Sequence, residues 1–337
     1  MKKTLLFCAA AITISATSVN ASTLDIVKER DTVRCGISTG FAGLSAPDDA
    51  GNWTGLDVDY CRSIAAAVLG DANKVEFIPL SSKNRLESLK SGEIDVLSRT
   101  TTWTFSRDNS LGLNFAGVNF YDGQGFMVPA SLGISSVKEL DGASICIQTG
   151  TTTEINLSEY FKLNGLTYEP VPIESPAQAR ASYLASRCDA YTTDSLGLAS
   201  QRSVFVDQTQ QVILPEIISK EPLGPVVRHG DDQWLDIVKW THNVLLAAEE
   251  SNITSINLDQ RGSNENDPAA QALLGTNNAK LGAMLGLDVK WAYNVIKQVE
   301  NHGEIFELNS FAKEVVLPRL MQCVSLDPVI FNFKLTV

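Results

Sequence analysis

The chain has 337 residues, 44% of them hydrophobic, and a formal net charge of -12. Its length allows a sizeable core and favours two lobes over one. The negative charge argues against nucleic acid or an anionic membrane as a partner, but it does not exclude a small ligand that enters a local basic pocket.

The N-terminus predicts export. Met1-Lys2-Lys3 is a charged start, residues 5–14 are apolar, and Ser18-Val19-Asn20-Ala21 offers the small residues that precede a cleavage site. Because the apolar run is short for a membrane span, we predict a signal peptide over residues 1–21 that is cleaved after Ala21.

The cysteines agree with export. Removing the signal takes away Cys8 and leaves Cys35, Cys61, Cys146, Cys188 and Cys323, which can form disulfides in an oxidising compartment. Spacing alone does not give their pairing. No cysteine or histidine spacing resembles a metal site, so we expect neither a metal nor a cofactor.

Strands and helices alternate along the chain. The first predicted group is a strand at 33–38, a helix at 57–69, a strand at 75–80, a helix at 83–91 and a strand at 94–97. A second group follows the extended run 126–128, with strands at 144–148, 168–173 and 188–193, helices at 151–164 and 175–186, an extended run at 212–219, and helices at 233–251 and 288–300. Such alternation is typical of mostly parallel sheets flanked by helices, and its repetition predicts two lobes with a cleft between them.

Polar clusters follow three of the predicted strands, where ligands collect in α/β sheets. After residues 94–97 come Thr100, Thr101, Thr102 and Thr104, with Arg107 close behind. An arginine fork and threonine hydroxyls together suit a carboxylate. The alternative is a threonine-rich turn with a solvated arginine.

The other two clusters stand at predicted helix starts. Thr151 and Glu154 have the spacing of a capping box, and free N–H groups beside such a cap also favour an anion. Asp194 either caps the next helix or pairs with an ammonium group. No P-loop, dinucleotide fingerprint or nucleophile elbow is present, so no enzyme class gains support.

These clusters, the export signal and the two-lobed layout together resemble one family. It is the periplasmic amino-acid-binding proteins of ABC transporters, of the general L-amino-acid type, within extracellular solute-binding protein family 3. The resemblance runs from about Asp31 to about Leu317 and is most specific in GNWTGLDVD (51–59), TTWT (101–104), LGLNFAG (111–117) and YDGQGF (121–126). The tail with Cys323 departs from the family pattern.

The resemblance implies a type II periplasmic binding protein fold, α/β, with each lobe a mostly parallel sheet flanked by helices. Lobe 1 would comprise residues 22–122 and 218–337, with a C-terminal helical extension, and lobe 2 residues 123–217. The expected disulfides are Cys35–Cys61 and Cys146–Cys188, each within one lobe, which leaves Cys323 unpaired.

The resemblance also implies a ligand held at both charged ends. Arg107, Thr102 and the backbone at Thr100 match the positions that bind the α-carboxylate, and Thr151 and Thr152 match the second lobe's contribution. Asp194 matches the residue that pairs with the α-ammonium. The remaining matched positions near the ligand are Ser38, Phe41, Ser82 and Gln148. Ser82 stands where relatives stack an aromatic ring, and Gln148 where a glutamine-specific relative has a basic side chain. Both departures imply a broad polar or acidic range.

The expected function is that of a monomeric periplasmic protein that binds free L-amino acids and delivers them to a membrane permease. Two alternatives stay open: an exported enzyme on the same scaffold acting on a small carboxylic acid, such as a dehydratase, and a ligand-sensing domain. The absence of a positioned histidine, cysteine or serine base counts against the enzyme.

Overall fold

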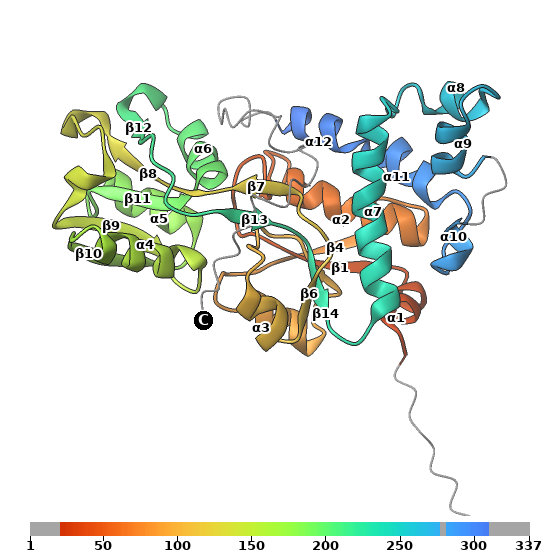
Figure 1. Cartoon of the computed structure of the whole chain (residues 1–337), viewed down its shortest axis with the longest axis horizontal. Coiled ribbons are helices and arrows are strands. Elements are labelled where there is room, and N and C mark those ends of the chain that lie inside the picture. Colours follow the sequence, from red (N-terminus) through yellow and green to blue (C-terminus); the bar gives the residue numbers. More distant parts are fainter. Residues whose placement is uncertain (1–20, 277–280, 310–337) are drawn as a thin grey trace, which may run out of the picture.

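The computed structural model describes residues 21–276 and 281–309, which form two lobes joined by extended segments (Figure 1). The strands are β1 Val33–Ile37, β2 Ala46–Pro47, β3 Trp53–Thr54, β4 Val75–Pro79, β5 Val96–Leu97, β6 Leu113–Phe115, β7 Phe120–Asp122, β8 Gln124–Pro129, β9 Ala143–Gln148, β10 Tyr168–Ile173, β11 Ala190–Asp194, β12 Gln211–Ile213, β13 Glu221–Leu223 and β14 Val226–Arg228. The α-helices are α1 Thr23–Arg30, α2 Leu56–Leu69, α3 Arg85–Ser91, α4 Thr152–Leu163, α5 Pro176–Leu184, α6 Ser195–Ser203, α7 Asp232–Glu250, α8 Leu258–Ser263, α9 Pro268–Leu274, α10 Leu281–Met284, α11 Trp291–Val299 and α12 His302–Leu308. A π-helical turn covers Ser106–Ser110, and short 3-10 turns cover Ala130–Leu132, Val137–Leu140 and Gln208–Gln210.

The first lobe is built on a sheet with strand order β4-β1-β5-β14-β6. Strands β4, β1 and β5 are parallel, whereas β14 pairs antiparallel with β5 and β6. Helix α2 packs against β1 and β4, and the disulfide Cys35–Cys61 joins β1 to α2. Cys61, on the helix predicted for residues 57–69, therefore faces this sheet.

The second lobe repeats this layout with strand order β10-β9-β11-β8-β12. Its first three strands are parallel, and β8 is antiparallel to both β11 and β12. Helices α4 and α5 pack against this sheet, and the disulfide Cys146–Cys188 lies within the lobe. Both cysteine pairs are the ones expected from the sequence. The extended run expected at 212–219 is a strand only over Gln211–Ile213, because Pro215 cannot donate to a sheet ladder.

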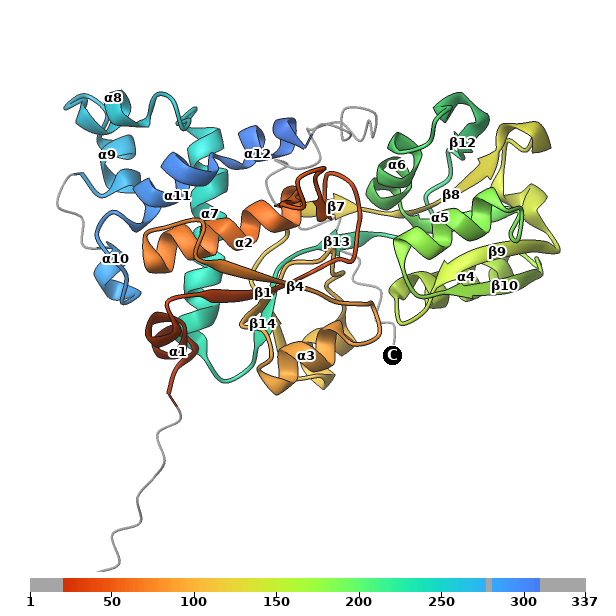
Figure 2. The ribbon, with the colours of Figure 1, turned by 180° about the vertical axis from the view of Figure 1, so that it is seen from behind.

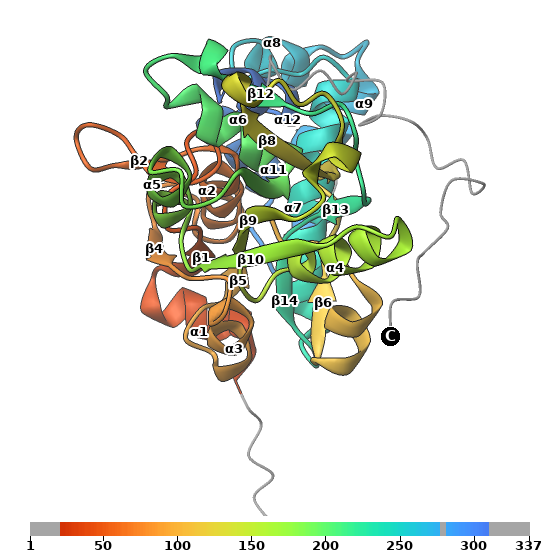
Figure 3. The ribbon, with the colours of Figure 1, turned by 90° about the vertical axis from the view of Figure 1, so that its left-hand side faces the viewer.

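Two strands connect the lobes. Strands β7 and β13 pair antiparallel, with Glu221 opposite Asp122 and Leu223 opposite Phe120. They run between the two sheets in the view from the back (Figure 2), and seen end-on one lobe lies in front of the other (Figure 3). We call β7 and β13 the hinge strands.

Helices α7 to α11 extend the first lobe on the side away from the second, whereas α12 lies nearer the middle of the molecule (Figure 1). Helices α7 and α11 pack on α2, and α12 packs on α7. The Tyr60 hydroxyl lies 3.1 Å from His242 Nδ1 and 2.9 Å from His302 Nδ1, which ties α12 to α2 and α7 through buried polar groups. No helix among residues 21–276 and 281–309 is long and apolar enough to cross a membrane. The predicted signal peptide up to Asn20 and the tail with Cys323 lie outside the described residues.

Candidate functional site

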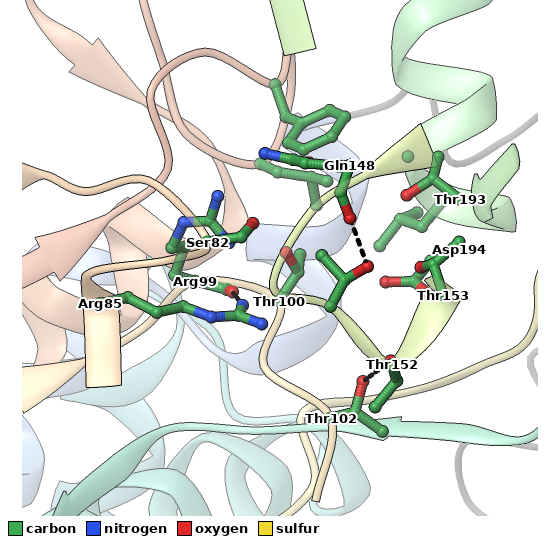
Figure 4. A pocket seen from close by; sticks show the side chains of 15 residues that line it. Ser82, Arg85, Arg99, Thr100, Thr102, Gln148, Thr152, Thr153, Thr193 and Asp194 are labelled. Carbon is green, nitrogen blue, oxygen red and sulfur yellow. Dashed lines mark hydrogen bonds between the residues drawn. The ribbon is translucent and has the colours of Figure 1, made fainter. Parts of the chain in front are cut away.

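A cavity of about 440 Å³ lies between the lobes, and both lobes contribute to its wall (Figure 4). It is lined by Phe41, Leu44, Ser82, Arg85, Arg99, Thr100, Thr102, Gln148, Thr151, Thr152, Thr153, Thr193, Asp194, Leu196 and Gly197. The mixture of charged groups, hydroxyls and one aromatic ring in this wall suits a polar ligand.

The wall contributed by the first lobe begins where β5 ends. Thr100 has a positive φ of 37°, an uncommon conformation for a residue with a side chain. Its N–H donates to Asp57 Oδ1 at 3.3 Å, and Asp57 is only 1% exposed. Burial raises the pKa of Asp57 to about 6, against the opposing hydrogen bond from Thr100 and the charge of Arg99. A buried carboxylate therefore holds the turn that presents Thr100 to the cavity.

The two lobes also contact each other directly beside the cavity. The Oγ1 atoms of Thr102 and Thr152 are 3.4 Å apart across the cleft, and Lys83 Nζ lies 3.0 Å from Glu174 Oε1. Gly150 also approaches the first lobe, where a Cβ would lie 3.2 Å from the Cα of Lys83, and its φ of 77° favours glycine. These contacts describe a closed arrangement of the lobes.

Arg107 lies next to Thr102 without lining the cavity. It is 7% exposed, and its Nη1 donates to the carbonyl oxygen of Thr102 at 2.8 Å. Burial lowers the pKa of Arg107, while the negative charges of Glu221 and Asp194 raise it. Because a guanidinium has five N–H donors, this bond leaves others for a second acceptor.

The N-terminus of α4 faces the cavity, and the capping box expected from Thr151 and Glu154 is wrong. Thr151 Oγ1 donates backwards to the carbonyl oxygen of Gln148 at 2.7 Å, and Glu154 Oε2 accepts from the N–H of Gly150 at 2.7 Å. No side chain caps the helix. The first-turn N–H groups, which no helix satisfies internally, are thus available to an anion.

Asp194 ends β11 and occupies the cap position of α6, but its side chain does not cap the helix. Asp122 does so instead, since its Oδ2 accepts from the N–H of Leu196 at 3.0 Å. Within the described chain, buried Asp194 Oδ1 has no hydrogen-bond partner. Burial, reinforced by the charges of Glu221 and Asp122, raises the pKa of Asp194 well above its usual range, although Arg85 and Arg107 oppose the shift. An unpaired carboxylate at a cavity wall is suited to a cation.

Two buried arginines that the sequence reasoning missed line the first-lobe side. Arg85 and Arg99 are each 3% exposed. Arg85 Nη1 donates to Arg99 O and Thr101 Oγ1 at 3.2 Å, and Arg99 Nε donates to Leu80 O at 2.9 Å. Arg85 Nε, Arg99 Nη2 and Ser82 Oγ have no partner among the described residues. This corner of the cavity therefore offers unused donors to an acceptor group.

Of the ten residues expected to lie near the ligand, all but two line this one cavity. The exceptions are Arg107 and Ser38, whose Oγ is fully buried and has no hydrogen-bond partner in the described part of the chain. Of the threonines after β5, Thr100 and Thr102 reach the cavity, whereas Thr101 donates to Arg99 O.

The residues that sequence reasoning missed are Leu44, Arg85, Arg99, Thr153, Thr193, Leu196 and Gly197. Thr193 stands beside Asp194 and Thr153 beside Thr152, so adjacency was an available signal for both. In residues 21–276 and 281–309 no group of three or more histidine, cysteine or acidic side chains could hold a metal ion.

Comparison with known proteins agrees with this geometry. The sequence model of bacterial extracellular solute-binding proteins, family 3, matches residues 33–253. The general L-amino acid-binding periplasmic protein AapJ of Rhizobium johnstonii is 52% identical over 301 residues, covering 89% of this chain and 88% of that protein. The glutamate/glutamine/aspartate/asparagine-binding protein BztA of Rhodobacter capsulatus is 51% identical over 310 residues, covering 92% and 91%. A solved periplasmic binding protein of an ABC transporter from Brucella ovis, with glutathione bound, is 52% identical with a TM-score of 0.84, covering 86% of this chain and 91% of that one.

Proposed function

The chain belongs to the bacterial extracellular solute-binding proteins of family 3, and from this premise we propose that it binds L-amino acids with polar, acidic or amide side chains in the periplasm for an ABC importer. The observation that carries the proposal is the cavity itself. Asp194 presents an unpaired carboxylate there, and the N-terminus of α4 faces the same space.

The two ends of a zwitterion fit different parts of the wall. We assign the α-carboxylate to the Thr102–Thr152 edge, where hydroxyls and the first-turn N–H groups of α4 converge and Arg107 supplies positive charge from behind. The α-ammonium is assigned to Asp194. In a desolvated cavity each of these pairs is much stronger than in water.

The side chain of the ligand would then extend towards Arg85, Arg99 and Ser82. Their unused donors favour a carboxylate or an amide oxygen over an apolar group. Phe41 and Leu196 supply apolar contact on the same cavity. Gly197 also lines this part of the cavity, and a Cβ there would lie 3.0 Å from Thr193 Cγ2.

A γ-glutamyl peptide is a second ligand class. The Brucella ovis relative is described with glutathione bound, and glutathione carries the same α-carboxylate and α-ammonium on its glutamyl end. The rest of glutathione needs more space than a free amino acid does. Comparing the binding of glutathione with that of L-glutamate therefore tests whether the cavity accepts the longer ligand.

We propose binding without turnover. Neither histidine nor cysteine is among the residues that line the cavity. Closure on a ligand would shift the population towards the closed form, which the permease distinguishes from the open one. The periplasmic location, signal cleavage after Ala21 and the monomeric state belong to the same proposal.

The proposal is tested by thermal-shift measurements on purified mature protein with each of the twenty amino acids and glutathione, followed by mass spectrometry of the incubated mixtures. We expect glutamate, glutamine, aspartate and asparagine to raise the melting temperature most, with every compound recovered unchanged. Failure of all twenty to bind would overturn amino-acid binding, and conversion of any compound would overturn the non-enzymatic reading.

A further inference from the structure

The hinge strands carry an acidic pair that the ligand contacts assigned above do not use. Asp122 and Glu221 stand directly opposite each other in the antiparallel register of β7 and β13, and they are 7% and 2% exposed. Like charges at opposite positions destabilise a strand pair, and burial increases the cost. Asp194 is the third carboxylate of this group, and its charge interacts with both.

The hydrogen bonds give Asp122 and Glu221 different roles. Glu221 accepts from Asn156 Nδ2 at 2.6 Å, Ser219 Oγ at 2.6 Å and Thr152 Oγ1 at 3.0 Å, a set of donors that matches an ionised, acceptor-only carboxylate. Asp122 accepts from two backbone N–H groups, those of Gly123 at 2.7 Å and Leu196 at 3.0 Å. The second bond caps α6 and leaves Asp194 free to face the cavity.

We propose that Asp122 is a positioning residue for Asp194, and that in the ligand-free protein these two buried carboxyl groups carry one proton in total, which the ligand's ammonium group displaces. On binding, the O–H bond of the carboxylic acid breaks, the proton passes to solvent, and the carboxylate pairs with the ammonium. The inference rests on the proposed function, because it needs a ligand with an ammonium group.

The surroundings support a shared proton. Burial, with a contribution from the charge of Glu221, raises the pKa of Asp122 to about 7 and moves that of Asp194 in the same direction. The groups that act electrostatically on Asp194, besides Asp122, are Glu221 from β13, Arg107 from the turn at Ser106–Ser110, Arg85 from α3, Arg99 after β5 and the buried Tyr191 hydroxyl from β11. The arginines favour ionisation and Glu221 opposes it, and an added ammonium group shifts this balance towards two ionised carboxylates.

The displaced proton makes ligand affinity depend on pH. Because the free protein binds the proton and the complex does not, affinity falls as pH falls through the range in which the free pair takes up its proton. Because burial raises the pKa of Asp122 to about 7 and raises that of Asp194 as well, the free pair should hold most of its proton at pH 6, and binding should be weaker at pH 6 than at pH 8.

The test is calorimetric titration with L-glutamine, whose side chain does not ionise, in buffers of different ionisation enthalpy at pH 6, 7 and 8. The wild type should release close to one proton at pH 6. Asp122→Asn keeps a cap acceptor but removes one charge, so its affinity should change less than about threefold between pH 8 and pH 6. Asp122→Ala also removes the cap, and we expect Asp194 to turn towards α6 and affinity to fall at every pH.

Asp141→Asn, at an exposed aspartate of the second lobe, is the matched control and should behave as wild type. Tight binding by the wild type with less than about 0.2 proton released at pH 6 would overturn this inference and leave the proposed function intact. A wild-type pH dependence retained in Asp122→Asn would do the same. Absence of binding by any amino acid would overturn both. The number of protons that the wild type releases on binding tests this inference even if a variant does not fold.

Discussion

At the scale of single residues, the site depends on two residues at helix N-cap positions whose side chains do not cap their helices. Asp194 occupies a cap position without capping, because Asp122 from a hinge strand takes over the bond to α6. Thr151 likewise occupies the cap position of α4 and donates backwards to Gln148. In the first case the Asp194 carboxylate is left for the cavity, and in the second the first-turn N–H groups of α4 are.

Arg107→Ala tests the assignment of the carboxylate end. Loss of a buried positive charge beside Thr102 should weaken L-glutamine binding by about 2–5 kcal/mol while leaving the fold intact. Arg34→Ala removes an exposed arginine, paired with Glu76 at 3.0 Å, and is the control. If calorimetry finds Arg107→Ala within about twofold of wild type, or less than ~0.5 kcal/mol, the assignment is wrong.

Asp57→Asn tests the buried carboxylate that holds Thr100. The folded-state pKa of Asp57 is raised from 3.8 to about 6, so its stabilising contribution is present below pH ~4 and is lost as pH rises through about 6. The loss amounts to about 3 kcal/mol at most. Urea unfolding of both proteins at pH 4 and pH 7 should show a smaller change with pH for Asp57→Asn. An equal change in the two proteins would contradict the raised pKa.

Residue roles were only partly predictable from sequence. Thr100, Thr102 and Asp194 could be singled out because each follows an apolar strand run, and position at a strand end is a local signal. Arg85 and Arg99 could not, because an arginine on a short helix or in a turn is usually solvated, and only tertiary packing buries them. Likewise, nothing local reveals that Asp122 would cap a helix that begins at Ser195.

At the scale of elements, the βα units follow from local patterns, whereas the hinge does not. Helix α2 and strands β1 and β4 lie within one or two residues of their predicted ranges, because apolar periodicity and flanking turns are local. Strands β7 and β13 are three residues each and pair across about a hundred residues of chain, so their pairing has no local signature. Helices α8, α9, α10 and α12 are short, and the periodic pattern of a few residues does not distinguish them from turns.

The disulfides give an element-scale prediction. Cys35–Cys61 and Cys146–Cys188 close segments of 26 and 42 residues, each within one lobe. Replacing either pair by alanine should cost roughly 3–4 kcal/mol of unfolding free energy in the chain-entropy model. Affinity for L-glutamine should stay within about twofold below the melting temperature, because neither bridge restrains the hinge. Loss of affinity in a folded variant would contradict this separation of lobe stability from closure.

At the scale of the whole molecule, closure assembles the site. The cavity wall comes from both lobes, and the Thr102–Thr152 contact and the Lys83–Glu174 pair exist only when the lobes meet. The ion pair is exposed, so its contribution to closure is at most about 1 kcal/mol. The larger contribution must come from a ligand that satisfies the unpaired groups of both lobes together.

The most direct measurement of the central claim is calorimetric titration of the wild type with L-glutamine and two analogues, each lacking one charged end. 4-Carbamoylbutanoate lacks the ammonium group, and 4-aminobutanamide lacks the α-carboxylate. Recognition of both ends predicts that each analogue binds at least about 30-fold more weakly, a loss of ~2 kcal/mol or more. Binding of either analogue within about threefold of L-glutamine would contradict the claim that this cavity holds an amino acid by its two charged ends.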